Sequence, residues 1–164
     1  MRHNGRPLLL MVCTVQFHKI LLLGVAIGLA ACSDDYGVDQ HGETIEAGQV
    51  EGHWLVINYW AEWCGPCRSE IPELNRLAKN EPNVRVFGVN YDQLKGSALT
   101  QAAEKMGIRY QVLAKDPAER FNLPASAALP VTYIVDARGQ LKERLIGEQH
   151  YETLRARLAA QGLE

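Results

Sequence analysis

The sequence predicts an α/β domain with a central mixed β-sheet, flanked by helices and carrying an inserted helix and strand in the middle of the fold. Short runs of β-branched and aromatic residues alternate with segments whose apolar residues recur at helical spacing, which is typical of this class. The 164 residues, of which 47% are hydrophobic and 22% charged, are enough for one domain with a substantial core. The net charge of −2 gives no indication of nucleic acid as a partner.

The order of the elements follows from these runs. Strands are predicted from β-branched and aromatic runs over residues 55–61, 84–91, 110–114, 131–136 and 140–146. Helices are predicted from apolar periodicity and stop signals over residues 64–79, 97–106, 116–121 and 150–160. Pro72 lies inside the first helix and should kink it, and Gly107 should end the second. Because a short turn at 137–139 joins the last two strands, we expect them to pair antiparallel.

The N-terminal residues predict a signal peptide. Arg2, Arg6 and Lys19 precede an apolar run over residues 20–31. A run of about 12 residues is too short to span a bilayer as a helix and suits the core of a signal peptide. Met11 is an alternative start, which would leave a more compact signal.

The apolar run ends in Leu29-Ala30-Ala31-Cys32, which resembles the lipobox of bacterial lipoproteins. The resemblance implies cleavage before Cys32 and a lipid group on its thiol, which would hold the chain to a membrane. The alternative is an ordinary secretory signal that leaves Cys32 as a free thiol. Polar residues follow, so the expected division is a signal peptide over 1–31, a lipidated cysteine with a flexible tether over 32–41, and a folded domain over 42–164.

Cys64 and Cys67 predict a redox-active pair. Structural zinc would need four ligands, and the sequence offers neither a second such pair nor clustered histidines. A c-type haem would need a histidine directly after Cys67, where Arg68 stands. A disulfide across two intervening residues closes too small a loop to be an effective staple. Thiol–disulfide exchange fits instead, because the pair follows a predicted strand and opens a predicted helix.

This placement predicts a role for each residue around the pair. Cys64 lies at the helix start, where the helix dipole favours a thiolate, so we expect it to be the nucleophile. Cys67 lies one turn further along and would resolve the mixed disulfide. Gly65 would let a substrate chain come close, and Pro66 suits the first helical turn. Trp63 is a candidate for the docking surface, with simple packing as the alternative.

The stretch WAEWCGPC resembles the active site of thioredoxins, and Pro72 falls at the offset of their helix-kinking proline. The resemblance implies a thioredoxin-like fold, in which a cis-proline loop faces the cysteines just before a strand. Leu129 and Pro130 occupy that place in this chain. Most X-Pro bonds are trans, so the cis prediction rests on the resemblance alone. It adds Leu129 and Pro130 to the residues expected to bind a substrate chain.

Several positions differ from thioredoxins and resemble a related group. Asn58 stands where thioredoxins carry a buried aspartate, and Gly88 where we align their lysine. Glu70 follows Cys67 by one helical turn, and residues 97–114 supply the inserted helix and strand. These features resemble the TlpA, ResA and cytochrome c maturation group of membrane-tethered thiol–disulfide oxidoreductases.

The resemblance to this group covers most of residues 43–161. It implies that Glu70 exchanges a proton with the thiol of Cys67. The alternative is a surface glutamate that is favoured near a helix start.

The expected function is therefore reduction of disulfides in envelope proteins. Expected partners are protein substrates that carry disulfides, and a membrane-bound or soluble thiol electron donor. The disulfide of Cys64 and Cys67 would be the only redox group, with no metal and no separate cofactor, and we expect a monomer. The Gly-Pro pair between the cysteines matches thioredoxin, a reductant at about −270 mV, which favours a reductase.

Three alternatives and the location stay open at this point. The same cysteines would serve an oxidase or isomerase, a thiol-based carrier of a soft ion such as Cu(I), or a docking module without catalysis. The lipobox resemblance implies a lipid-anchored domain in the bacterial cell envelope, facing the periplasm. Ser33 follows Cys32, which favours the outer membrane over the inner membrane, although Asp34 leaves another sorting rule open.

Overall fold

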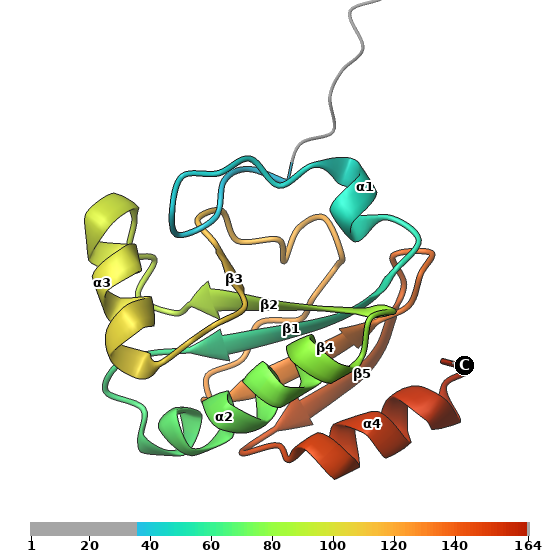
Figure 1. Cartoon of the computed structure of the whole chain (residues 1–164). Helices are drawn as coiled ribbons and strands as arrows, with labels where there is room; N and C mark the ends of the chain where they lie inside the picture. Colours follow the sequence, from blue (N-terminus) through green and yellow to red (C-terminus); the bar gives the residue numbers. More distant parts are fainter. Residues whose placement is uncertain (1–35, 164) are drawn as a thin grey trace, which may run out of the picture. The chain divides into compact units, whose positions relative to one another are not determined.

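The computed structural model describes residues 36–163, which form the predicted α/β fold (Figure 1). The predicted signal peptide and Cys32 lie outside the described residues. Within residues 36–163 no helix is long and apolar enough to cross a membrane. The elements in chain order are α1 (Ala47–Val50), β1 (Trp54–Trp60), α2 (Gly65–Asn80), β2 (Val84–Asn90), α3 (Gly96–Met106), β3 (Gln111–Leu113), β4 (Val131–Val135), β5 (Leu141–Ile146) and α4 (Tyr151–Ala160).

The strands form a five-stranded mixed sheet in the order β3-β2-β1-β4-β5. β1 pairs parallel with β2 and β2 with β3, whereas β4 runs antiparallel to both β1 and β5. The start of β4 therefore lies beside the end of β1, and Val131 is directly opposite Tyr59. This arrangement confirms the mixed sheet and the closing hairpin. It also brings the residues before β4 close to the end of β1, where the chain continues into α2.

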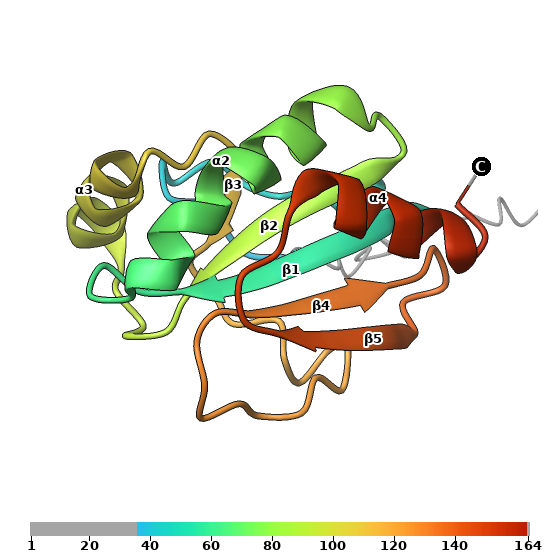
Figure 2. The same cartoon turned by 90° about the horizontal axis from the view of Figure 1, so that it is seen from below.

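Two apolar clusters cover the two faces of the sheet. The first lies under α2, α3 and α4, and its fully buried residues include Val56, Leu74 and Leu154. The second lies on the opposite face and includes Ile57 and Tyr133. Figure 2 shows α2 and α4 on one side and the long segment between β3 and β4 on the other. The alternation of β1 residues between the clusters follows from the two-residue period of a strand.

The predicted helix over 116–121 is wrong, because this segment forms turns. The Asp116 side chain accepts a hydrogen bond from the N–H of Ala118 at 2.8 Å, which starts a single turn after Pro117. The N–H of Phe121 then donates to the carbonyl of Pro117, and Asn122 follows with a φ of 50°. A left-handed residue ends a helix, so the turn cannot continue.

The end of the expected tether is part of the domain. Residues 36–41 belong to the predicted tether over 32–41, yet Asp39 and Gln40 are buried. Asp39 forms an isolated bridge with Leu113 at the open edge of β3. The Gln40 side chain accepts from the N–H of Val112 at 2.7 Å and donates to the carbonyl of Tyr110 at 3.3 Å. These bonds satisfy backbone groups at the sheet edge, which is why a polar segment lies here.

Candidate active site

Cys64 and Cys67 form a disulfide at the start of α2. Cys64 is the N-cap residue, and its sulfur accepts a hydrogen bond from the N–H of Cys67 at 3.2 Å. Cys67 is fully buried, whereas Cys64 keeps 5% of its surface exposed. The first turn of the helix therefore directs an N–H group at the sulfur of Cys64, the arrangement that stabilises a thiolate there.

Glu70 is a buried carboxylate one turn beyond Cys67, on the inner side of α2. Its oxygens accept hydrogen bonds from the side-chain amide of Asn58 at 2.6 Å and from the N–H of Gln149 at 3.1 Å. Burial raises the pKa of Glu70 to about 7, although both hydrogen bonds lower it. A carboxyl group with this pKa exchanges protons near neutral pH, which is what a proton donor and acceptor needs.

The polar groups around Glu70 come from distant parts of the chain. Asn58 also donates to the hydroxyl of Thr132 at 3.1 Å, across the pairing of β1 with β4. Thr132 and Gln149 were not recognised in the sequence. They lie 74 and 79 positions from their partners, and neither belongs to a local motif. Only the β-sheet register and the loop before α4 bring them together.

Gly88 lies directly opposite Asn58 on β2, at the position aligned with the thioredoxin lysine. A Cβ atom at Gly88 would lie 2.9 Å from the indole nitrogen of Trp60 and 3.2 Å from the ring of Tyr110. The space that a lysine side chain would need is therefore filled by two aromatic rings. The indole N–H of Trp60 and the hydroxyl of Tyr110 are buried and have no hydrogen-bond partner among residues 36–163. Neutral groups thus replace the charge that a lysine would bring near Glu70.

The residues beside the disulfide are accessible. Trp63 is 66% exposed, and its indole N–H donates to the carboxylate of Asp92 at 3.0 Å. Its ring meets Tyr91 edge to face, with centroids 6.2 Å apart. Gly65 and Pro66 are also exposed, and nothing lies within 4 Å of a Cβ built on Gly65. Trp63 therefore packs against Tyr91 while most of its surface stays exposed.

Leu129 and Pro130 join through a cis peptide bond just before β4. The carbonyl oxygen of Pro130 accepts a hydrogen bond from the N–H of Gly147 at 2.9 Å. Pro130 itself has no N–H group, and its carbonyl is already paired with Gly147.

The described residues contain no group of three or more His, Cys, Asp or Glu side chains that could hold a metal ion. The site that the described residues form consists of a disulfide, a buried carboxyl group and an exposed aromatic surface. A disulfide at a helix start with this surrounding defines a thiol–disulfide oxidoreductase of thioredoxin-like fold.

Comparison with known proteins identifies the family. Residues 29–144 match the AhpC/TSA family, and the chain belongs to it. It is 27% identical over 118 residues to the thiol-disulfide oxidoreductase ResA of Bacillus thuringiensis (strain Al Hakam), covering 71% of this chain and 68% of the relative. It is 33% identical over 122 residues to the thiol:disulfide interchange protein DsbE of Pseudomonas fluorescens biotype C, covering 73% and 67%.

The fold has close counterparts among solved structures. The crystal structure of a DsbF homologue from Corynebacterium diphtheriae superposes with a TM-score of 0.64 and 19% identity, covering 76% of this chain and 82% of that chain. The relatives agree with the enzyme class that the disulfide defines, and the solved structure agrees with the fold.

Proposed function

We propose that this enzyme reduces disulfides in proteins of the bacterial cell envelope. The observation that carries the proposal is the disulfide at the start of α2 with a buried carboxyl group one turn away. Cys64 is assigned as the nucleophile, since it is the partly exposed cysteine and its sulfur accepts a helix N–H. Cys67 is assigned as the resolving cysteine, since it is fully buried behind Cys64.

The proposed reaction transfers two electrons by thiol–disulfide exchange. The Cys64 thiolate attacks one sulfur of the substrate disulfide, and the other substrate sulfur leaves as a thiolate. Cys67 then attacks the sulfur of Cys64, which forms the Cys64–Cys67 disulfide and releases the second substrate thiolate. The substrate is reduced by two electrons and the enzyme is oxidised by two. A thiol electron donor must reverse the enzyme's oxidation before the next turnover.

Glu70 is proposed to accept the proton of the Cys67 thiol when Cys67 attacks. The carboxyl group lies one helical turn from Cys67, and burial raises its pKa to about 7. A group with this pKa takes up a proton from a thiol and returns it to solvent at neutral pH. Asn58 and Gln149 hold the carboxyl group in place through its two oxygens.

The substrate chain is proposed to lie between Trp63 and the loop at Leu129 and Pro130. Trp63, Gly65 and Pro66 are exposed on one side of the disulfide. Leu129 offers backbone groups on the other side, while the carbonyl of Pro130 is paired with Gly147. An extended segment that pairs with Leu129 would present its cysteine to Cys64.

The proposed location is the bacterial envelope, with a lipid on Cys32 and the outer membrane favoured. The N–H of Tyr36 bonds to the carbonyl of Ile45, so the packed domain reaches at least to within four residues of Cys32. A fully extended link of this length reaches about 14 Å. So short a link would keep the domain close to its own membrane. We therefore propose a soluble thiol donor if that membrane is the outer one.

The reduction potential of the Cys64–Cys67 pair tests the proposed direction. The chain from Ser33 onward is equilibrated in graded thiol–disulfide buffers, and free thiols are trapped with a mass tag. A value near thioredoxin's, about −270 mV, supports the reductase. A value near the strong periplasmic oxidants, about −120 mV, would assign the same cysteines to disulfide formation instead. Inert thiols would contradict the whole proposal.

A further inference from the structure

A groove opens on the face of the sheet opposite α2, and we call it the tyrosine groove. Its volume is about 400 Å³, and it is lined by Tyr59, Tyr91, Tyr133, Asp116 and the segment 123–126, among others. The rings of Tyr59 and Tyr133 meet edge to face, with centroids 5.6 Å apart. Three tyrosines and one carboxylate thus line the groove together with apolar and amide side chains, and Tyr133 itself is buried.

The tyrosine groove adjoins the candidate active site. Val131, which also lines it, directly follows Pro130 and is paired with Tyr59. Tyr91 lies at its other side and contacts the ring of Trp63, the residue before Cys64. Tyr91 is 44% exposed, so its ring is available to a bound chain. A substrate segment held between Trp63 and Leu129 would therefore pass along the mouth of this groove.

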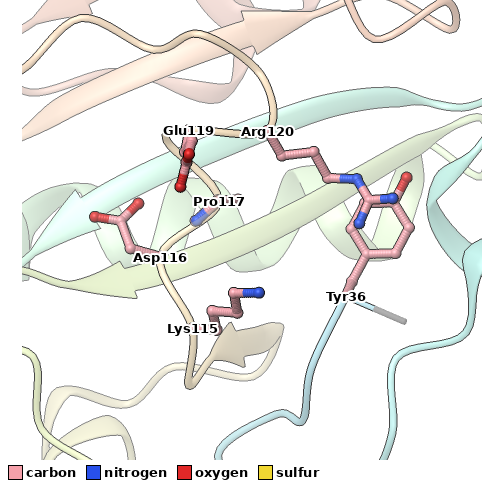
Figure 3. A pocket seen from close by; sticks show the side chains of 6 residues that line it. All are labelled: Tyr36, Lys115, Asp116, Pro117, Glu119 and Arg120. Carbon is pink, nitrogen blue, oxygen red and sulfur yellow. The ribbon is translucent and has the colours of Figure 1, made fainter. Parts of the chain in front are cut away.

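Asp116 is the one acidic side chain among the described residues that line the groove. Burial raises the pKa of Tyr133, whereas Arg144, opposite Tyr133 on β5, lies close enough to the Tyr133 hydroxyl to lower that pKa. The Oδ1 atom of Asp116 accepts from the hydroxyl of Tyr59 at 2.6 Å and from the N–H of Ala118 at 2.8 Å. Its Oδ2 atom has no hydrogen bond or ion pair within residues 36–163, and no Lys or Arg is among the described residues that line the groove. Figure 3 shows the Asp116 carboxylate pointing away from the side that holds Tyr36 and Arg120. The Lys115 amine points toward that side and not toward the carboxylate.

We propose that the tyrosine groove binds a lysine or arginine side chain of the substrate, close in sequence to the cysteine that Cys64 attacks. Tyrosine faces attract a cation, and a carboxylate beside them adds a charge-assisted contact. Asp92, which binds the Trp63 indole, adds a second negative charge at the active-site end. The inference rests on the proposed function, and it adds a substrate preference that thiol–disulfide exchange itself does not require.

The test uses disulfide-bonded peptides that differ at one position. Lysine, norleucine or glutamate is placed in turn at each of the positions flanking one cysteine, and the second-order rate constant with the full reduced protein is measured. We expect lysine to be favoured over norleucine about fivefold to tenfold at one position, and glutamate to be disfavoured there. Because the contact is partly exposed, added salt should reduce the preference.

Two variants show whether a lysine preference comes from the groove or from the overall negative charge of the protein. Asp116→Asn keeps an oxygen for Tyr59 and Ala118 but removes the charge, so the lysine preference should fall at least threefold. Glu119→Gln removes an exposed carboxylate that does not line this groove, and the preference should stay as in the wild type. Wild-type measurements carry the test alone if Asp116→Asn does not fold.

The outcomes are distinct for the two proposals. An absent lysine preference, an equal preference at every position, or an equal loss in Glu119→Gln would overturn the groove inference and leave the enzyme's function intact. A reduced protein that reacts with none of the peptides, although its thiols are free, would overturn the proposed function and the inference with it.

Discussion

Glu70 is the residue whose environment is least expected from its type. A carboxyl group is rarely fully buried without a cation beside it, and here its partners are the neutral amides of Asn58 and Gln149. Burial raises the pKa of Glu70 from 4.5 to about 7. The folded chain therefore binds a proton at Glu70 more tightly than the unfolded chain does. Between these two pKa values the folded state loses stability as pH rises.

Glu70→Gln should remove this part of the pH dependence. We expect the free energy of unfolding of the oxidised wild type to fall by up to about 3 kcal/mol more than that of the variant between pH 4.5 and 8. Urea unfolding across this range measures the difference. Glu104→Gln is the matched control, because Glu104 is exposed on α3 and should leave the profile unchanged. Parallel profiles for wild type and Glu70→Gln would show that Glu70 titrates normally.

Gly88→Ala should destabilise the domain by about 1–3 kcal/mol through overpacking. The added Cβ would lie 2.9 Å from the Trp60 indole nitrogen and 3.1 Å from a methyl group of Val112, and both neighbours are buried. Thermal or urea unfolding measures the loss. Gly48→Ala in α1 is the control, because nothing lies within 4 Å of its Cβ. If both substitutions lower the free energy of unfolding by the same amount, the close contacts at Gly88 do not cause the destabilisation.

At this scale the sequence identified the cysteines but not the surroundings of Glu70. Cys64, Cys67 and Glu70 lie within one short stretch, so spacing and helix position were sufficient to single them out. The partners Thr132 and Gln149 depend on strand register and on a loop before α4, which no local pattern encodes. The tyrosine groove was missed for the same reason, because its tyrosines come from three different strands or their ends.

The element that differs most from the prediction is the segment before α1. A polar and acidic run is typical of a flexible tether, yet residues 36–41 cover the exposed edge of β3. Their polar side chains are what the edge needs, since unpaired backbone N–H and C=O groups require partners. Composition alone could not distinguish these two uses of a polar segment.

Gln40→Ala should destabilise the domain by about 1–3 kcal/mol. The change leaves the N–H of Val112 and the carbonyl of Tyr110 without their side-chain partner in a buried position. Urea unfolding gives the total cost, and amide hydrogen exchange at Val112 shows whether the edge opens locally. His41→Ala is the neighbouring control, since His41 is exposed. An unchanged exchange rate at Val112 would contradict the role assigned to Gln40.

Other elements were predictable to the extent that their signals were local. The strands of the sheet follow β-branched and aromatic runs, and Gly107 ends α3 in the left-handed conformation, with a φ of 74°. The helix expected over 116–121 does not form, because Asp116 caps a single turn and the left-handed Asn122 ends that turn. In a segment this short, capping and backbone conformation outweigh helix propensity.

At the scale of the whole molecule, the topology places the candidate functional residues near one end of the central strands. The order β3-β2-β1-β4-β5 places the end of β1 next to the start of β4. The disulfide then lies on the face covered by α2, and the tyrosine groove on the opposite face. Leu129 packs against the apolar clusters on both faces, so a strand bound at Leu129 and Pro130 could contact both.

The fold as a whole should favour the oxidised state if the enzyme is a reductase. A thermodynamic cycle links the reduction potential of the folded pair to the difference in stability between the two redox states, and every 30 mV corresponds to about 1.4 kcal/mol. A strong oxidant stabilises its reduced form, whereas a reductant gives up electrons because its folded structure favours the disulfide. We therefore expect a higher free energy of unfolding for the disulfide form than for the dithiol form, measured by urea unfolding with and without reductant.

Cys64→Ser should abolish the dependence on reductant, because no disulfide can form between positions 64 and 67. A dithiol form that is the more stable of the two would reverse the proposed direction of electron flow.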